Sequence, residues 1–253
     1  MAGEVFVKVL DSVDSTNRYV RDEADALWHE AVVCNARMVA VTARSQTAGR
    51  GQRGNVWISE DGKNILLSLL LRMGDTIEVA RQFCLSQTIA VALHRTMLHY
   101  GVETRLKWPN DIYVGHCKIA GVLVELDFSG QYIEQAIIGV GLNVNQEVFP
   151  PIDRVPVSMK MLLGKDFLLQ EVLNTLLDEF GKLFDELLNG GRESIAAEYD
   201  KLLLGYAERY RYKDSSGEFF AFVEGVEPSG QLLLRRDNGT LSRYSFREIE
   251  QIL

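Results

Sequence analysis

The apolar run at residues 65–71, broken only by Ser68, is the feature that most constrains the fold of this chain. It is short enough for a strand, and its lack of alternation predicts that both faces of the strand are buried. The chain has 253 residues, of which 47% are hydrophobic, so it can supply a sizeable core around this strand. Its length allows one large domain with a small appendage, or two modest domains.

The loop that leads into this strand has an unusual composition. Half of the residues at 49–54 are glycine, which lets backbone N–H groups approach a ligand closely. Arg50 and Arg53 lie among these glycines and carry planar forks of donors that fit carboxylate or phosphate oxygens. Such a loop suits an anionic small molecule. The alternative is a solvated surface loop whose arginines make ordinary ion pairs.

Composition excludes several classes of protein. Acidic residues outnumber basic ones 35 to 27, and this net charge of -8 argues against nucleic acid as the main partner. Cys34, Cys84 and Cys117 are far apart, so they indicate neither a disulfide framework nor a structural zinc site. The chain shows no secretory signal and no apolar run of membrane-spanning length. We therefore expect a reduced cytoplasmic protein that does not enter the membrane.

Hydrophobic periodicity before residue 145 predicts a sheet with helices. Valines alternate on one side of a first strand, and Ser15 suits the N-cap of a first helix. The predicted strands lie at residues 4–10, 38–43, 65–71, 102–107, 112–114, 118–127 and 131–143. The predicted helices lie at about residues 15–28 and 78–100. Glycine-containing hairpin turns join the last three strands into an antiparallel meander that packs on the buried strand.

The pattern changes towards the carboxy terminus. An apolar stripe predicts an amphipathic helix at residues 167–188, and a further helix is expected at 194–204. Short strands then recur at intervals of about ten residues, which is typical of a small β-barrel of about fifty residues. These strands are expected at residues 209–212, 219–226, 232–235 and 243–246.

Four groups of sequence motifs follow one another between residues 14 and 145. They are DSTN at 14–17, GRGQRGNVW with GKNILLSLLLR at 49–72, KWPND with KIAGVLVE at 107–125, and GVGLNVN at 139–145. Together and in this order they resemble the motifs of the biotin protein ligases. The combination is far more specific than any one motif.

The resemblance implies a fold and a reaction. The fold class would be α+β, with a mixed, largely antiparallel sheet covered by helices at residues 1–204 and an SH3-like β-barrel at 205–253. The enzyme would convert biotin and ATP to biotinoyl-5′-AMP and pyrophosphate, with Mg²⁺ accompanying ATP. It would then transfer the biotinoyl group to a lysine of a biotin carboxyl carrier protein. A monomer or weak homodimer is expected.

The resemblance also implies roles for individual residues. Lys118 and Arg50 would be catalytic, because the attack of a carboxylate on a phosphate needs nearby cations. Biotin would contact Ser15, Thr16, Asn17, Gln46, Arg50, Gly51, Gln52 and Lys118. The adenylate would contact Arg53, Asn55, Trp57, Asn110, Asp111 and Asn143. No residue is assigned as a metal ligand, although Asp111 would aid metal binding.

Each of these residues also has a simpler interpretation. The segment after Asp14 could be only a helix cap, Lys118 only a solvated charge, and Asn143 only the end of a strand. The chain also departs from the family pattern, since some members carry arginine where it has Gln52 and Asn55. Bifunctional members begin with a winged-helix DNA-binding domain. The motifs here start at residue 14, so the monofunctional form is expected.

Two rival functions remain open. Lipoate or octanoate ligases and transferases share the fold and also attach an acyl group to lysine, but GRGQRG with KWPND favours biotin. A rival of another class is a non-catalytic adaptor that binds peptides through the terminal β-barrel. Replacement of Lys118 by alanine distinguishes the adaptor from the ligase, because an adaptor would not depend on that ammonium whereas the ligase would lose most of its adenylation activity.

Overall fold

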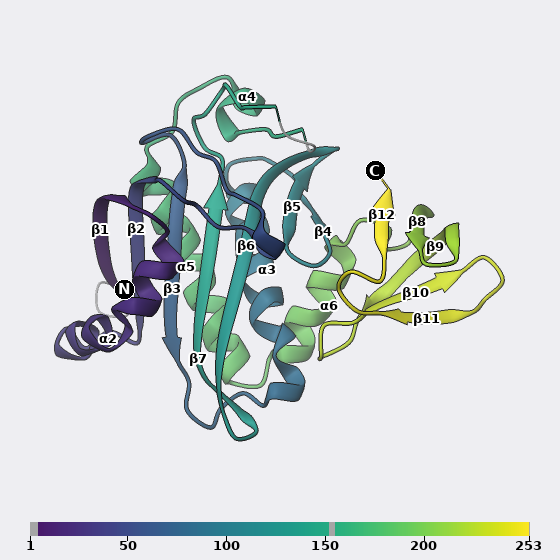
Figure 1. Cartoon of the computed structure of the whole chain (residues 1–253), viewed down its shortest axis with the longest axis horizontal. Helices are drawn as coiled ribbons and strands as arrows, with labels where there is room; N and C mark the ends of the chain where they lie inside the picture. Colours follow the sequence, from purple (N-terminus) through teal and green to yellow (C-terminus); the bar gives the residue numbers. More distant parts are fainter. Residues whose placement is uncertain (1–4, 152–154, 253) are drawn as a thin grey trace. The chain divides into compact units, whose positions relative to one another are not determined.

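The structure is a computed structural model that describes residues 5–151 and 155–252, apart from the side chain of Arg53 (Figure 1). It divides into two compact units, Met1–Glu78 with Cys117–Thr175 and Val79–His116 with Leu176–Leu253. The first predicted strand was expected to start at Glu4, which lies outside the described residues.

The first unit contains a mixed sheet whose strands run in the order β1-β2-β3-β7-β6, from left to right in Figure 1. Strand β1 pairs with β2 in parallel, and each other neighbouring pair in this series is antiparallel. The bounds are Val5–Val13 for β1, Met38–Gln46 for β2, Ile65–Arg72 for β3, Cys117–Ser129 for β6 and Tyr132–Leu142 for β7. Every residue of β3 except Arg72 is buried. The predicted mixed sheet and its central buried strand are therefore confirmed.

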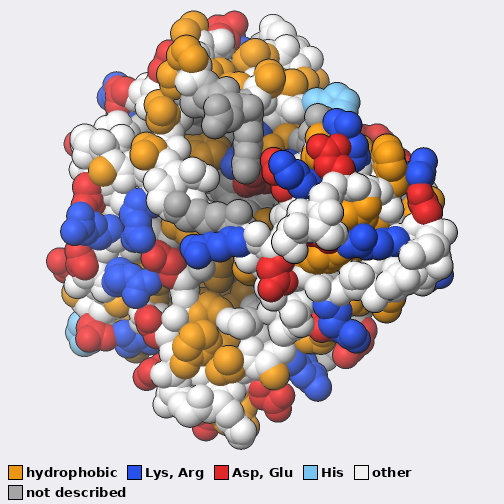
Figure 2. All heavy atoms as spheres, turned by 45° about the vertical axis from the view of Figure 1, so that its right-hand side comes forward, with side chains coloured by type: hydrophobic (Ala, Val, Ile, Leu, Met, Phe, Trp, Pro, Cys, Tyr) orange, Lys and Arg blue, Asp and Glu red, His pale blue; other side chains and the backbone are white. Residues whose placement is uncertain are grey.

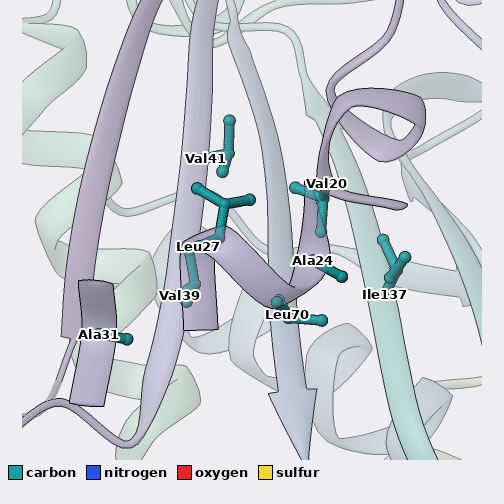
Figure 3. Close-up of a cluster of buried hydrophobic side chains, with 8 residues drawn as sticks. All are labelled: Val20, Ala24, Leu27, Ala31, Val39, Val41, Leu70 and Ile137. Carbon is teal, nitrogen blue, oxygen red and sulfur yellow. The ribbon is translucent and has the colours of Figure 1, made fainter. Parts of the chain in front are cut away.

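Helices α1 (Thr16–Asp22) and α2 (Ala24–Val33) cover one face of this sheet. Figure 3 shows Val20 and Leu27 from these helices directed at side chains of β2, β3 and β7. The sheet side of this cluster comprises Val39, Val41, Leu70 and Ile137. Burial of apolar side chains from both layers supplies the main stabilisation of this part of the core.

The single helix predicted at residues 15–28 is wrong in its continuity. Helix α1 ends at Glu23, whose N–H donates to the Tyr19 carbonyl (3.0 Å). Helix α2 begins after the same residue, since the Glu23 carbonyl accepts from the Leu27 N–H (2.9 Å). Neither glycine nor proline marks this break, so the sequence carries no signal for it. At the start of α1, Ser15 is the N-cap residue, but its side chain makes no capping hydrogen bond.

Strand β1 turns its valines away from the core. Val7 and Val9 are 39% and 67% exposed, whereas Phe6 and Leu10 pack against the cluster beneath the helices. The predicted alternation is present, and the opposite side chains of the strand supply the buried face. This follows from the period of two along a strand.

A short helix, α4 (Met159–Leu163), follows β7 and was not predicted. Ser158 caps it, since its Oγ accepts from the N–H of Met161 (3.2 Å). Two hydrogen bonds join the residues before and after α4. The Asn145 side chain donates to the Phe167 carbonyl (2.8 Å) and accepts from the Phe167 N–H (2.9 Å). A helix this short cannot display a helical repeat, which explains why periodicity missed it.

The second unit contains the long buried helix and a hairpin. Its elements are the 3₁₀ turn η2 (Val79–Arg81), α3 (Phe83–His99), β4 (Arg105–Lys107), β5 (Asp111–Val114), the later part of α5 (Leu169–Leu188), and α6 (Arg192–Leu202). The predicted helix at 78–100 is thus confirmed from Phe83 onward. The bend between β4 and β5 includes a cis peptide bond between Trp108 and Pro109. On α3, Arg95 forms a bidentate pair with Glu198 of α6 (3.0 and 2.5 Å).

A separate antiparallel sheet forms the carboxy-terminal part of this unit, in the order β11-β10-β9-β8-β12. The strands are β8 (Tyr210–Asp214), β9 (Gly217–Val226), β10 (Leu232–Arg236), β11 (Leu241–Tyr244) and β12 (Glu250–Ile252). The four predicted strands are present, although β11 begins and ends two residues earlier than the range 243–246. Strand β12 was not predicted, because three residues are too few to show alternation.

Asp200 on α6 gives the second unit a pH-dependent contact with β9. Its carboxylate accepts from the Val226 N–H (3.2 Å), and burial raises its pKa to about 6 although that hydrogen bond opposes the shift. Gly225 lies against it, because an added Cβ there would be 2.6 Å from Asp200 Oδ2. The folded state therefore binds more protons than the unfolded state between the unfolded pKa of about 4 and pH 6.

We expect Asp200→Asn to raise the melting temperature relative to the parent protein, by a few degrees at pH 7.5 and less at pH 4.5. The charged carboxylate is the destabilising form, so the parent protein loses stability as pH rises through this window. The asparagine oxygen can still accept from Val226. Asp237→Asn is the control of opposite sign, because the Arg209 hydrogen bond lowers the pKa of Asp237. A melting-temperature difference for Asp200→Asn that is the same at both pH values would contradict this account.

Candidate active site

The candidate site lies on one face of β3, β7 and β6, where β7 presents glycines in place of side chains. A Cβ added at Gly139 would lie 2.3 Å from Asn17 Oδ1, and one added at Gly141 would lie 2.3 Å from Trp57 Cε2. Such distances are far inside van der Waals contact. The two glycines therefore leave the space that Asn17 and Trp57 occupy, which explains their place in the GVGLNVN motif.

Trp57 and Lys118 lie together at one end of this face. Gly121 of β6 pairs in register with Gly141 of β7, so two residues without side chains adjoin beneath the indole. Lys118 Nζ lies 5.6 Å from the centroid of the Trp57 ring. The Lys118 backbone is fixed on both sides, since its N–H donates to the Val155 carbonyl (2.8 Å) and its carbonyl accepts from Val157 (3.0 Å). The ammonium is thus held beside an aromatic surface.

A buried polar cluster forms the other end of this face. The N–H of Thr16 donates to Gln46 Oε1 (2.7 Å), and the Thr16 hydroxyl lies 2.8 Å from Ser68 Oγ. Ser68 Oγ lies 2.6 Å from Asn17 Oδ1. Thr16, Asn17 and Ser68 are all buried. Buried polar groups in such a connected arrangement are held in fixed orientations, which suits the recognition of a small polar group.

Arg50 joins this cluster through a carboxylate. Asn17 Nδ2 donates to Glu125 Oε2 (2.9 Å), and Arg50 Nη1 lies 3.4 Å from Glu125 Oε1. Arg50 is half-exposed, with 49% of its side chain open to solvent, so its ion pair with Glu125 is weak. Arg50 can therefore exchange Glu125 for another anion.

The glycine-arginine loop is folded on itself. The N–H of Gly51 donates to the Asn55 carbonyl (2.7 Å), and the N–H of Trp57 donates to the Gly49 carbonyl (3.0 Å). Between them lies the 3₁₀ turn η1 (Gln52–Gly54). These bonds give the loop a defined hairpin-like shape that carries Arg50 and Trp57 to the glycine-lined face.

The structure brings most of the predicted site residues together in the first unit. These are Ser15, Thr16, Asn17, Gln46, Arg50, Gly51, Gln52, Arg53, Asn55, Trp57, Lys118 and Asn143. Asn110 and Asp111 lie in the second unit, where Asp111 is a buried residue that pairs in register with Lys107. Asn55 is exposed, and Arg53 is described by its backbone only.

Two buried polar atoms of the site, Trp57 Nε1 and Asn143 Oδ1, have no hydrogen-bond partner among the residues that the structure describes. Asn143 is 3% exposed, and its Nδ2 donates to the Val157 carbonyl (3.1 Å). An unpartnered buried polar atom is costly, so a ligand that supplied the missing partner would gain binding energy. Trp57 offers a donor and Asn143 an acceptor.

Ser68 and Glu125 belong to the site but were not predicted as site residues. The sequence did carry a signal for Ser68, because a hydroxyl within an otherwise apolar buried strand needs a hydrogen-bond partner. Glu125 ends the KIAGVLVE motif, yet a single carboxylate on a strand cannot be distinguished from an ordinary surface charge by spacing alone.

The described residues supply few other features that bear on function. Among them, no three side chains of the metal-binding types gather into a site, and no helix is long and apolar enough to span a bilayer. On the face shown in Figure 2, acidic and basic side chains are interspersed. In the second unit, Arg235 and Glu224 form an exposed ion pair (2.6 Å).

Comparison with known proteins places this site in a family. The model of the Biotin/lipoate A/B protein ligase family matches residues 9–143, more than half of the chain. The chain belongs to this family. The match covers the glycine-lined face, the glycine-arginine loop and Lys118, all of which lie within the first unit.

Similar proteins within the family carry ligase names. The chain is 31% identical over 208 residues to the bifunctional ligase/repressor BirA of Bacillus spizizenii, covering 81% of this chain and 64% of that protein. It is 31% identical over 207 residues to the biotin–[acetyl-CoA-carboxylase] ligase of Paracoccus denitrificans, covering 79% and 85%. The biotin protein ligase of Aquifex aeolicus in complex with biotin and ATP has the same fold, with a TM-score of 0.77, 22% identity and 98% of each chain covered.

Proposed function

We propose that this chain is an ATP-dependent biotin–protein ligase. The observation that carries the proposal is that one glycine-lined face joins a buried polar cluster to the ammonium of Lys118. A polar cluster at one end and a cation at the other match a substrate with a neutral polar head, an apolar middle and a carboxylate. The name of the relative from Paracoccus denitrificans, a biotin–[acetyl-CoA-carboxylase] ligase, supports the same substrate.

The head of biotin is a cyclic urea, with N–H donors and one carbonyl acceptor. Gln46 turns its oxygen to the Thr16 N–H (2.7 Å), so its amide nitrogen remains to donate to the urea carbonyl. The Ser15-Thr16-Asn17 segment supplies the other contacts to the head. Gly51 and Gln52, in the glycine-arginine loop, would also contact biotin and form one edge of its binding site.

Lys118 would assist the first chemical step. A carboxylate oxygen of biotin attacks the α-phosphorus of ATP, and the bond from that phosphorus to the leaving pyrophosphate breaks. Both partners are anionic, so a fixed cation lowers the barrier by neutralising charge as they approach. Arg50 would exchange its ion pair with Glu125 for one with the new anion. This exchange would fold the glycine-arginine loop over the adenylate and limit hydrolysis of the adenylate by water.

Within the first unit, the nucleotide would be held by Arg53, Asn55, Trp57 and Asn143. The nucleotide contacts of Asn110 and Asp111 in the second unit stay predictions of the family resemblance. The indole of Trp57 would offer an aromatic surface near the adenine, and Asn143 Oδ1 would offer an acceptor that has no partner within the described part of the chain. Since no cluster of metal-ligating side chains occurs among the described residues, Mg²⁺ would be carried mainly by the phosphate oxygens of ATP.

In the second step, the amine of a carrier lysine attacks the acyl carbon of biotinoyl-AMP. A C–N bond forms, the C–O bond to AMP breaks, and the amine loses a proton to solvent. The partner would be a biotin carboxyl carrier domain. We further propose a catalytic domain at residues 1–204, an SH3-like domain at 205–253, a cytoplasmic location, and a monomer or weak homodimer.

The proposal is tested by transfer of biotin to the isolated carrier domain of an acetyl-CoA carboxylase. Purified protein, ATP, Mg²⁺ and biotin should add one biotinoyl group to that domain, as measured by intact-protein mass spectrometry. A carrier whose acceptor lysine is replaced by arginine is the control and should gain no mass. Failure to modify the unaltered carrier, with folded protein and all substrates present, would argue against the proposal.

A further inference from the structure

Glu125 of β6 is the carboxylate through which the parts of the site are connected. Its Oε2 accepts from Asn17 Nδ2 (2.9 Å), while its Oε1 lies 3.4 Å from Arg50 Nη1 and 3.5 Å from Arg21 Nη2. Only 18% of its side chain is exposed. A mostly buried carboxylate that contacts an amide and two guanidinium groups has a defined orientation.

Glu125 fixes the orientation of the Asn17 amide. An ionised carboxylate can only accept hydrogen bonds, so the nitrogen of Asn17 must face Glu125. The oxygen of Asn17 then faces Ser68 Oγ at 2.6 Å and must accept from it. The single hydroxyl proton of Ser68 is thereby committed to Asn17.

The same argument fixes the proton on Thr16. The contact between Thr16 Oγ1 and Ser68 Oγ is 2.8 Å, and since Ser68 already donates to Asn17, Thr16 must donate here. Gln46 Oε1 is satisfied by the Thr16 N–H at 2.7 Å, closer than the 3.1 Å contact with the Thr16 hydroxyl. The remaining lone pair of Thr16 Oγ1 can therefore only accept a hydrogen bond.

We infer that Glu125 is a positioning residue that sets this chain of hydrogen bonds and so makes the polar cluster selective for a head group with N–H donors. The inference rests on the proposed function. A cyclic urea can donate to the Thr16 oxygen, whereas the dithiolane of lipoate and the alkyl end of octanoate cannot. A site built to pair with a polar group discriminates strongly against analogues that lack it.

Loss of the Glu125 carboxylate removes the shorter of the two hydrogen bonds from the Asn17 nitrogen (2.9 Å) and leaves only the longer one, to the Leu123 carbonyl (3.5 Å). The Asn17 amide can then rotate so that its nitrogen donates to Ser68, which reverses the chain. Ser68 would donate to Thr16, and the Thr16 hydroxyl proton would be free to face the ligand. An N–H donor of the urea would meet a donor, while an apolar head group would lose nothing.

The test is isothermal titration of biotin into the parent protein and into Glu125→Ala, Ser68→Ala and the double variant. We expect each single variant to bind biotin about tenfold more weakly, the loss of one hydrogen bond. The double variant should be no weaker than the singles, because both act through Asn17. In ATP–pyrophosphate exchange, Glu125→Ala should raise the KM for biotin about tenfold and leave kcat within about threefold.

Asp127 supplies the matched control, because it lies two residues along β6 and contacts Arg21 (3.5 Å) without a hydrogen bond to Asn17. Asp127→Ala should bind biotin within twofold of the parent. If Glu125→Ala does not fold, as judged by its melting temperature, Glu125→Gln takes its place. Its oxygen would be shared between Asn17 and the arginines, so an intermediate loss of affinity is expected.

The outcomes separate the two ideas. If the parent protein neither binds biotin nor supports exchange, the proposed function and this inference both fail. If the parent binds biotin and Glu125→Ala matches it within twofold, only the inference fails. Strictly additive losses in the double variant would also overturn it, since they would mean that Glu125 and Ser68 act independently.

Discussion

Replacement of Lys118 by alanine is expected to reduce biotin adenylation by about 100- to 1000-fold, the usual cost of removing one preorganised charge from a reacting centre. Lys118 Nζ lies beside the Trp57 ring, 5.6 Å from its centroid, above the paired Gly121 and Gly141. The backbone of Lys118 is fixed by two hydrogen bonds, so the alanine variant should keep its fold.

The matched control is Lys165→Ala. Lys165 Nζ also lies over an aromatic ring, 5.2 Å from the centroid of Phe167, but it belongs to the segment before α5 and not to the glycine-lined face. ATP–pyrophosphate exchange with biotin should fall only in Lys118→Ala. Equal exchange rates in the two variants would mean that Lys118 is only a solvated charge, and would contradict its proposed function in adenylation.

Replacement of Gly139 by alanine is expected to weaken biotin binding by about 100-fold, because it displaces the side chain that organises the polar cluster. The added Cβ would lie 2.3 Å from Asn17 Oδ1 and 2.9 Å from its Cγ. Asn17 would then lose its bonds to both Ser68 and Glu125. Overpacking of this kind costs about 1–3 kcal/mol of folding free energy, so the protein should remain folded.

Gly181→Ala on α5 is the control for a glycine substitution. An added Cβ there meets no atom within 4 Å, and a helical position favours alanine over glycine by about 0.5–1 kcal/mol. Its biotin affinity should equal that of the parent, and its melting temperature should not fall. Isothermal titration and thermal unfolding check both variants. Unchanged affinity in Gly139→Ala would mean that Asn17 does not shape the site.

The central sheet could be predicted because its hydrophobic patterns are strong. The apolar run in β3, broken only by Ser68, indicates a strand covered on both faces, and the hairpin turns indicate the antiparallel β6–β7 pair. Elements with few residues, such as α4 and β12, are too short to show a period. The break at Glu23 has no glycine or proline to mark it, so it depends on packing that the sequence does not reveal.

The candidate site was predicted mainly through the family resemblance, and the structure adds physical reasons for the motifs. Gly139 and Gly141 were noted only as part of a motif, and their function of making room for Asn17 and Trp57 depends on strand register. Ser68 interrupted an apolar run, which was a usable signal. The part played by Glu125 depends on a contact with Asn17 across 108 positions of sequence, which no local pattern can contain.

The most direct test of the account is ATP–pyrophosphate exchange by the purified protein, with biotin, lipoate and octanoate compared as the acid. We predict rapid exchange with biotin, and at least about 100-fold slower exchange with the other two acids, because only biotin carries N–H donors on its head group. Exchange with lipoate or octanoate in place of biotin would assign the chain to the other substrate class of its family. Absence of exchange with any of the three acids, in folded protein, would contradict the proposal that this site activates a carboxylate.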